Sequence, residues 1–335
     1  MAGRGIRRLA FTAFALAAAL GIAGYVSVEA PYRGFASEVI VEIPRGSGTR
    51  QIARQLAEAG VVRTEWHFLA ARLLRPGRAL QAGEYQFLKA ATPLEVLSRI
   101  VRGDIFFFEV TFPEGSNLFD MAGILEQQRI LQAKEFIAAA RDPGLIRDLA
   151  PEAPSLEGYL FPATYRLTRH TTARQLTRDM TTRFRRAWKE LAAQAPVHST
   201  VTLASLVEKE TAVGDERPLV AAVFKNRLER GMKLDCDPTT IYAALLEGRY
   251  RGTIYRSDLD SRNAYNTYQN AGLPPGPIAN PGMKALAAAL HPADAGHLFF
   301  VARADGSGSH IFSSTVEAHN KAVAEYRRGQ RKTSH

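Results

Sequence analysis

The stretch that decides the fold of this chain is residues 201–213, which read VTLASLVEKETAV. Apolar residues recur there at helical spacing, so the segment predicts a helix with one buried face. Two glutamates near its end, Glu208 and Glu210, lie two residues apart, which turns their side chains about 200° away from each other. Glu210 follows Leu206 by four residues and Val207 by three. The pattern therefore places Glu210 on the buried face and Glu208 on the opposite side.

A carboxyl group on a buried helix face has two interpretations. It can pair with a buried cation, for which Arg217 and Arg227 are the candidates, or burial can keep it partly protonated where a proton is delivered. Helix geometry alone leaves both open, and the ion pair is the commoner arrangement. Because Glu210 is the glutamate on the buried face, it is the candidate proton donor if the second interpretation holds.

The residues after this helix predict two more helices and a long irregular loop. Residues 216–218 begin a second helix, which Gly231 ends, and residues 236–240 (CDPTT) cap a third over 241–246. Residues 264–282 read AYNTYQNAGLPPGPIANPG. So many Pro, Gly and Asn residues beside two tyrosines predict a rigid loop with polar donors and an aromatic face, a surface that suits a sugar.

Towards the N-terminus, residues 38–103 predict a small α+β module. Residues 38–43 and 83–88 alternate as strands do, a helix precedes Gly60, and Thr92-Pro93 caps a helix over 94–101. The pattern leaves open whether the module is a spacer or binds glycan. Further on, the pattern predicts a strand over 105–112, a helix over 118–128, a domain boundary near 194–199 and a closing hairpin from 298–302 and 310–312.

The first thirty residues predict a membrane anchor. Residues 9–28 carry no charge and follow Arg4, Arg7 and Arg8. About twenty apolar residues in a helix cross a bilayer, whereas a cleaved signal peptide has an apolar core of about 7–15 residues. We therefore expect a retained single-pass anchor in the bacterial inner (plasma) membrane, with the arginines in the cytoplasm and the bulk of the chain periplasmic or extracellular.

Composition narrows the function classes. The 335 residues are 46% hydrophobic and 23% charged, which excludes a mainly disordered, collagen-like or polytopic membrane protein. The net charge of +10 suits nucleic acid, anionic lipid or an anionic polymer such as cell-wall glycan, and the expected topology disfavours nucleic acid. The single cysteine, Cys236, excludes an intramolecular disulfide and a multi-cysteine metal site. The histidines lack metal-ligand spacing, so we expect neither a metal nor a cofactor.

Taken together and in this order, these motifs resemble the YceG-like endolytic murein transglycosylases. The segments that carry the resemblance are LASLVEKETAVGDERPLVAAVFKNRLERGMKL, CDPTTIY, the 264–282 loop and a late HIFSS, and the match extends from the anchor to His319. Ala163 departs from the family pattern, which has Asp there, and Cys236 stands where Ser or Thr is more usual. The resemblance implies an N-terminal anchor, a LysM-like glycan-binding module and a C-terminal catalytic domain. Together with the sequence pattern it divides the chain into an anchor over 1–30, the LysM-like module over 38–103, a mixed α/β linking region over 104–196, an α+β catalytic domain over 197–325 and a basic tail over 326–335.

The resemblance also implies an activity. The second glutamate of the EKE triplet, Glu210, would act as general acid and then base, cleaving the MurNAc-β-1,4-GlcNAc bond within peptidoglycan strands to leave 1,6-anhydro-MurNAc ends. The substrate-binding residues that we predict are Glu216, Asp237, Thr239, Asn266 and Tyr268. The expected partners are glycan strands, the bacterial membrane and cell-wall synthases. Two alternatives stay open: a hydrolase in which Glu216 or Asp237 activates water, and a non-catalytic, membrane-tethered glycan-binding scaffold.

Overall fold

The computed structural model describes residues 2–333 and groups the chain into two compact units, 1–108 (unit 1) and 109–335 (unit 2). The last two residues of the predicted basic tail lie outside the described residues. So do the side chains at 2–10, 13, 17, 20 and 331–333, which include those of Arg4, Arg7 and Arg8. Each unit is described by itself.

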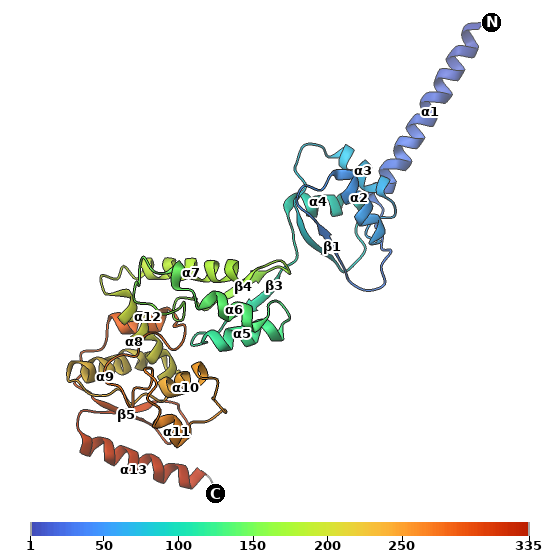
Figure 1. The fold of residues 1–335 in the computed structure, drawn as a ribbon. Helices are drawn as coiled ribbons and strands as arrows, with labels where there is room; N and C mark the ends of the chain where they lie inside the picture. Colours follow the sequence, from blue (N-terminus) through green and yellow to red (C-terminus); the bar gives the residue numbers. More distant parts are fainter. Residues whose placement is uncertain (1, 334–335) are drawn as a thin grey trace. The chain divides into compact units, whose positions relative to one another are not determined.

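Unit 1 contains one long helix followed by a small α+β module (Figure 1). Its elements are α1 (Ala2–Glu29), β1 (Val39–Ile43), α2 (Thr49–Glu58), α3 (Glu65–Leu74), β2 (Gly83–Phe87) and α4 (Pro93–Arg102). The two predicted strands and the helix after Thr92 are confirmed, and Thr92 forms a capping box with Glu95. The sequence prediction missed α3. Its apolar spacing is blurred because Trp66 and Leu73 are exposed while Phe68 is buried.

The predicted membrane anchor falls within α1. Within the part of the chain that the structure describes, no helix combines the length and the apolar character needed to cross a membrane. The anchor stays a prediction from the sequence.

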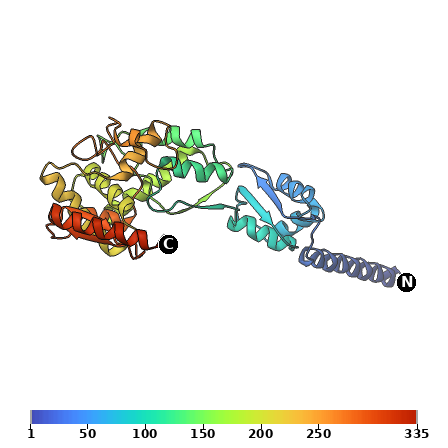
Figure 2. The same ribbon diagram turned by 90° about the horizontal axis from the view of Figure 1, so that it is seen from below.

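The core of the module forms on one face of an antiparallel strand pair. β1 and β2 lie side by side (Figure 2), with Val39 opposite Phe87 and Ile43 opposite Gly83. Because side chains alternate along a strand, Val41 and Tyr85 point inward. They belong to a buried cluster with Ile43, Ile52, Leu56, Phe68, Phe87, Leu97 and Ile100.

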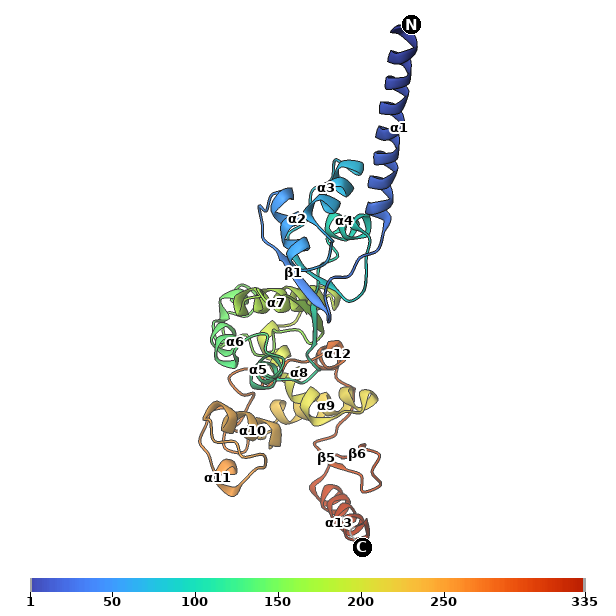
Figure 3. The ribbon, with the colours of Figure 1, turned by 90° about the vertical axis from the view of Figure 1, so that its right-hand side faces the viewer.

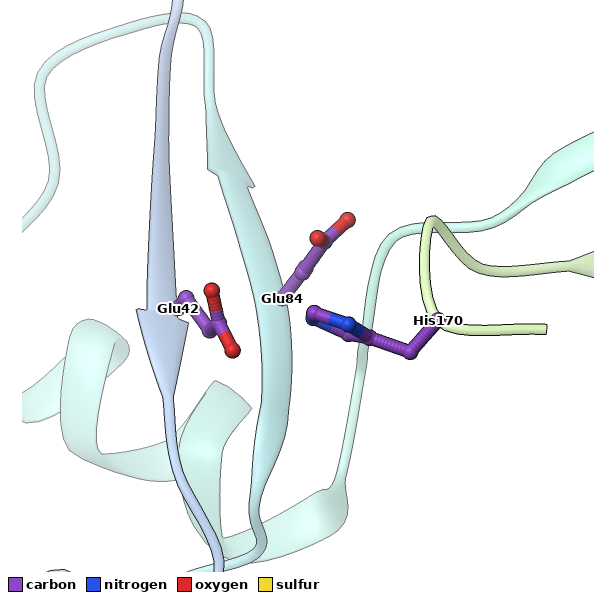
Figure 4. A group of neighbouring side chains, drawn as sticks. All are labelled: Glu42, Glu84 and His170. Carbon is purple, nitrogen blue, oxygen red and sulfur yellow. The ribbon is translucent and has the colours of Figure 1, made fainter. Parts of the chain in front are cut away.

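The opposite face of this strand pair carries two acidic residues. Glu42 and Glu84 stand directly opposite each other in the register and appear as sticks on the two neighbouring strands in Figure 4. The third residue labelled there, His170, belongs to unit 2, where it lies in the turn between β4 (Thr164–Leu167) and α7 (Ala173–Glu190).

Unit 2 is mainly helical, with two short strand pairs, β3–β4 and β5–β6. Its elements besides β4 and α7 are β3 (Phe108–Thr111), α5 (Leu118–Gln127), α6 (Ala133–Ala140), η1 (Pro143–Leu145), α8 (Val197–Glu210), η2 (Gly214–Glu216), α9 (Arg217–Glu229), α10 (Asp237–Leu246), α11 (Arg256–Leu259), α12 (Met283–Leu290), β5 (Phe299–Ala302), β6 (His310–Ser313) and α13 (Val316–Thr333). The predicted helix over 118–128 and the closing hairpin are confirmed, since β5 and β6 pair antiparallel.

Helix α8 lies at the centre of unit 2, where it packs on α9, α10 and α12 (Figure 3). Every residue from 200 to 207 is buried. The prediction of a single apolar face is therefore wrong: the helix is enclosed all round, as core helices are. It also ends earlier than expected, at Glu210, because Thr211 already adopts an extended conformation with φ −138° and ψ 130°.

One buried side chain joins the two halves of unit 2. Asn280 donates from Nδ2 to the carbonyl oxygen of Ser116 at 2.9 Å and to Oε1 of Glu157 at 2.8 Å, and its Oδ1 accepts from the Leu160 amide at 2.9 Å. These contacts cross the boundary expected near 194–199, and the structure groups residues 109–335 into a single unit. The functional division into a linking region and a catalytic domain stays a prediction.

The C-terminal segment is helical as far as it is described. Helix α13 packs on β5 and β6, buries Ala322 and continues through residues 326–333 of the predicted tail (Figure 1). Arg327 and Arg328 of the predicted tail thus lie on a regular helix.

Candidate functional site

Glu210 is the last residue of α8, and its carboxyl is buried. Oε1 accepts a hydrogen bond from Sγ of Cys236 at 3.0 Å. Burial raises the pKa of Glu210 and the neighbouring Asp237 raises it further, while the Cys236 hydrogen bond and the charges of His310 and Arg227 lower it; the net direction is upward. The negative end of the helix dipole also disfavours an ionised carboxylate at this position. This is the environment that the sequence predicted for a proton donor; the catalytic role itself stays a prediction.

Glu208, two residues earlier, is held in a different way. Its Oε1 accepts from Nη2 of Arg217 at 2.9 Å and its Oε2 accepts from the Gly282 amide at 2.9 Å. The two side chains of the ion pair are only 5% and 10% exposed. Arg217, a candidate partner of Glu210 in the sequence, instead pairs with Glu208. This ion pair ties the end of α8 to the beginning of α9 and to the end of the 264–282 loop.

The segment that carries Cys236 is fixed by Arg227 of α9. Nη1 of Arg227 donates to the carbonyl oxygens of Lys233 and Leu234 at 3.1 and 3.0 Å, and Nε donates to that of Leu298 at 2.7 Å. Asp235 adopts a left-handed conformation with φ 50°, unusual for a residue with a side chain. The hydrogen bonds of Arg227 therefore fix the turn that places Cys236 beside Glu210.

Two buried threonines complete the surroundings of Cys236. Oγ1 of Thr239 donates to the Cys236 carbonyl at 2.7 Å, and the Cys236 amide donates to Oγ1 of Thr267 at 3.0 Å. The two hydroxyl oxygens are 2.9 Å apart. Because the hydroxyl hydrogen of Thr239 is used in the hydrogen bond to the Cys236 carbonyl, Thr267 is the donor between the two hydroxyls. Thr239, a predicted substrate contact, is fully buried. Its position supports a role in fixing the turn.

Asn266, another predicted substrate contact, is also fully buried. Its Oδ1 accepts from Oγ1 of Thr240 and from the Tyr268 amide. Its Nδ2 contacts three backbone oxygens, those of Asp258, Leu259 and Ser261, at 3.2, 3.0 and 2.7 Å. The amide group thus satisfies backbone groups of a loop that has no regular partners and fixes that loop, while its contact with substrate stays a prediction.

Asp237 and Tyr268 are joined by a hydrogen bond, and Asp237 lies near enough to Glu210 to raise its pKa. Oη of Tyr268 donates to Oδ1 of Asp237 at 2.7 Å. Asp237 is exposed, and Tyr268 is half-buried. Asp237 is thus the one exposed residue among the five predicted substrate contacts.

Glu216 forms a pair that sequence reasoning missed. Its Oε1 accepts from the His310 amide at 2.9 Å, and its Oε2 lies 2.7 Å from Nδ1 of the same histidine. Both side chains are mostly buried. From the sequence, the histidines are considered only as metal ligands, whose spacing they lack. The signal that His310 belongs here is its place in the closing hairpin. His310 also acts on Glu210, lowering the pKa of that carboxyl.

A second buried carboxyl lies in the aromatic segment 157–162. Burial raises the pKa of Glu157 to about 8, and its Oε2 accepts from the Leu118 amide at 2.9 Å. Tyr159 in the same segment is fully buried, whereas Phe161 is half-buried and borders a cavity of about 560 Å³. Most of this segment therefore belongs to the core.

Comparison with known proteins confirms the resemblance read from the motifs. Residues 41–325 match the YceG-like family. A protein of Bacillus subtilis (strain 168) named endolytic murein transglycosylase is 33% identical over 309 residues, with 86% of this chain and 84% of that protein covered. A protein of the same name from Streptococcus pneumoniae serotype 2 (strain D39 / NCTC 7466) is 30% identical over 331 residues, and the match covers 86% of this chain and 58% of that longer protein.

A solved structure agrees with this assignment. The YceG-like protein of Listeria monocytogenes superposes with a TM-score of 0.54 at 30% identity, covering 86% of this chain and 99% of that one. The sequence match, the curated relatives and the shared fold point to one conclusion. The chain belongs to the YceG-like family.

Proposed function

We propose that this chain is a lytic transglycosylase that cuts peptidoglycan within its glycan strands, at the MurNAc-β-1,4-GlcNAc bond. The observation that carries the proposal is the state of Glu210: a buried carboxyl with a raised pKa, fixed by one hydrogen bond and placed beside the exposed Asp237. The names of the curated relatives support the substrate class.

In the first step Glu210 acts as general acid. Its raised pKa favours the protonated form of the carboxyl, as a proton donor requires. The proton passes to the glycosidic oxygen as the C1–O bond breaks, and positive charge develops on the MurNAc ring. We assign the stabilisation of that charge to the carboxylate of Asp237, which is exposed and near enough to Glu210 to raise its pKa.

In the second step Glu210 acts as base. The carboxylate formed in the first step removes the proton of the MurNAc C6 hydroxyl, whose oxygen bonds to C1 and closes the 1,6-anhydro ring. No water is consumed and the acid is regenerated, so one carboxyl suffices. Thr239, Asn266 and Arg227 act through the backbone: they hold the 233–236 turn and the 258–268 loop around the site.

The hydrolase alternative needs a second carboxylate to activate water. Glu216 is poorly suited to that task because both of its oxygens are engaged by His310. Asp237 is exposed and remains available for it. The two reactions differ in product: a hydrolase leaves a reducing MurNAc end, which is one water heavier than the anhydro end.

Unit 1 and the N-terminus complete the proposal. We assign the 38–103 module as a LysM-like glycan-binding module, because no residue of it has the placement of a catalytic acid, and its test is co-sedimentation with insoluble peptidoglycan.

The uncharged run at 9–28 supports a retained inner-membrane anchor, with the other residues periplasmic or extracellular and within reach of cell-wall synthases. N-terminal sequencing of protein from the membrane fraction tests the anchor, and a mature N-terminus near residue 28 would overturn it.

Mass spectrometry of fragments from purified peptidoglycan tests the activity. The full chain in detergent should release fragments with anhydro ends, and Glu210→Gln should lower the rate by at least about 10³-fold, because one group serves as both acid and base. The matched control is Glu229→Gln on α9, where the side chain is 61% exposed and which should keep full activity. Reducing ends would favour the hydrolase, and an equally active Glu210→Gln would refute the assignment.

A further inference from the structure

The structure places the only thiol of the chain against the carboxyl that we assign to catalysis. Sγ of Cys236 is 3.0 Å from Oε1 of Glu210, and Cys236 is 1% exposed. We propose that Cys236 is the positioning residue of Glu210: its thiol donates a hydrogen bond to Oε1 and fixes the carboxyl in the orientation in which Glu210 transfers its proton to the glycan. This inference rests on the proposed function and adds a residue that acts through Glu210, without touching the glycan.

The backbone around Cys236 leaves the thiol little freedom. Its carbonyl accepts from Thr239, its amide donates to Thr267, and Arg227 binds the two carbonyls just before Asp235. Cys236 also precedes α10, yet its side chain makes no capping hydrogen bond there. The side chain is thus committed to Glu210, while threonines and backbone groups maintain the turn.

A thiol is a weak donor, and this determines the expected effect. A hydrogen bond to the ionised carboxylate favours ionisation, so a stronger donor makes Glu210 a stronger acid and a lost donor makes it a weaker one. The other groups acting on Glu210 come from separate elements: Asp237 of α10, Arg227 of α9 and His310 of β6, which is paired with Glu216. Changing Cys236 leaves all of these in place.

Two substitutions separate positioning from packing. Cys236→Ser and Cys236→Ala lose about the same volume, but only serine keeps a donor, and a stronger one. Activity should fall as pH rises through the titration of Glu210, because the acid must be protonated. This alkaline limb of kcat/KM should move to lower pH in Cys236→Ser and to higher pH in Cys236→Ala, with the two variants separated by about one pH unit, or about tenfold in rate above the limb.

A merely structural role predicts a different result. Both variants would then lose a similar fraction of folded, active protein and keep the limb of the unmodified chain. Limbs that coincide in Cys236→Ser and Cys236→Ala would overturn the inference.

An infrared measurement tests the contact between Cys236 and Glu210 independently of catalytic activity. The chain has one cysteine, so its S–H stretching band comes from Cys236 alone. In the full chain this band should shift with pH as Glu210 ionises, and in Glu210→Gln it should stay constant. A constant band in the unmodified chain, with Glu210→Gln inactive, refutes the role of Cys236 and leaves the proposed function standing. A titrating band with Glu210→Gln fully active supports the contact and refutes the proposed function.

Discussion

The two glutamates of the EKE triplet, Glu208 and Glu210, should respond differently to substitution by glutamine: one variant should lose stability and the other should lose activity. In the unmodified chain the two carboxylate oxygens of Glu208 accept from Arg217 and from the Gly282 amide. Glu208→Gln removes the charge that faces Arg217 and leaves only one accepting oxygen, so the amide NH₂ must face one of these two donors. The pair is buried, with side chains 5% and 10% exposed, so water cannot replace the lost partner. Breaking a buried ion pair by removing one partner costs about 3–5 kcal/mol of unfolding free energy. We expect a loss in that range.

Glu210→Gln should leave the stability nearly unchanged, within about 1 kcal/mol, because the neutral amide resembles the protonated acid and can still accept from the thiol. Its effect should fall on catalysis. Glu208→Gln should keep measurable activity per folded molecule, since its contacts join α8, α9 and Gly282 outside the hydrogen bond to Cys236. The same chemical change thus lowers stability at one position and rate at the other.

Urea unfolding followed by tryptophan fluorescence measures this difference. The chain has two tryptophans, Trp66 in unit 1 and Trp188 in unit 2, so a Trp66→Phe background reports on unit 2 alone. In that background the unfolding free energy of Glu208→Gln should fall by about 3–5 kcal/mol in urea, and heating followed by the same fluorescence should show a melting temperature lower by roughly 10 °C. Adding Arg217→Met to Glu208→Gln should recover part of the loss, because the stranded cation is then removed. A loss below about 1 kcal/mol in Glu208→Gln would refute the reasoning, since it would mean that solvent screens the pair.

Two further predictions concern buried polar groups of unit 2. The folded-state pKa of Glu157 is raised to about 8 from its ordinary value of 4.5, so the unfolded chain releases this proton first, and the unfolding free energy should fall as pH rises through that window. Urea midpoints between pH 5 and pH 8 should therefore decline for the unmodified chain and decline less for Glu157→Gln; equal slopes would contradict the assignment. Asn266→Ala should cost about 2–4 kcal/mol and speed amide hydrogen exchange over residues 258–268, because several backbone oxygens lose their donor. The exposed Arg262→Ala in the same loop is the control and should change stability by less than about 0.5 kcal/mol; a similar loss in both variants would show that Asn266 has no special role.

Local patterns predicted most of the regular structure. The strands at 39–43 and 83–87, the capped α4 and the closing hairpin follow from alternation, turn residues and the Thr92-Pro93 signal, all of which act between neighbours in sequence. The family was also evident from the motifs. Helix α3 escaped notice because several of its apolar residues are exposed, which hides the helical period.

The environment of the site could not be predicted in the same way. The helical spacing placed Glu210 on a buried face and Glu208 opposite it, and the structure does not bear out this distinction, since residues 200–207 of α8 are buried all round and Glu208 is enclosed as well. What separates the two carboxyls is the partner each receives: a guanidinium for Glu208, and a thiol 26 residues away for Glu210. Asn266 and Thr239 resembled surface donors because they lie in a polar loop and at a helix start. Only the folded backbone shows that carbonyl groups face them.

The hydrogen bonds of Asn280 have a consequence for how unit 2 folds. Its partners Ser116, Leu160 and Glu157 lie 164, 120 and 123 residues earlier in the chain. Contacts of such long range form slowly, because a long loop must close before any of them contributes. During synthesis, the segments around 116 and 157 have to wait for residue 280 to emerge before Oε1 of Glu157 gains its hydrogen bond from Asn280. The core around residues 116–160 therefore stays incomplete until residue 280 has been synthesised, and in this interval the chain depends most on chaperones and is most exposed to proteases.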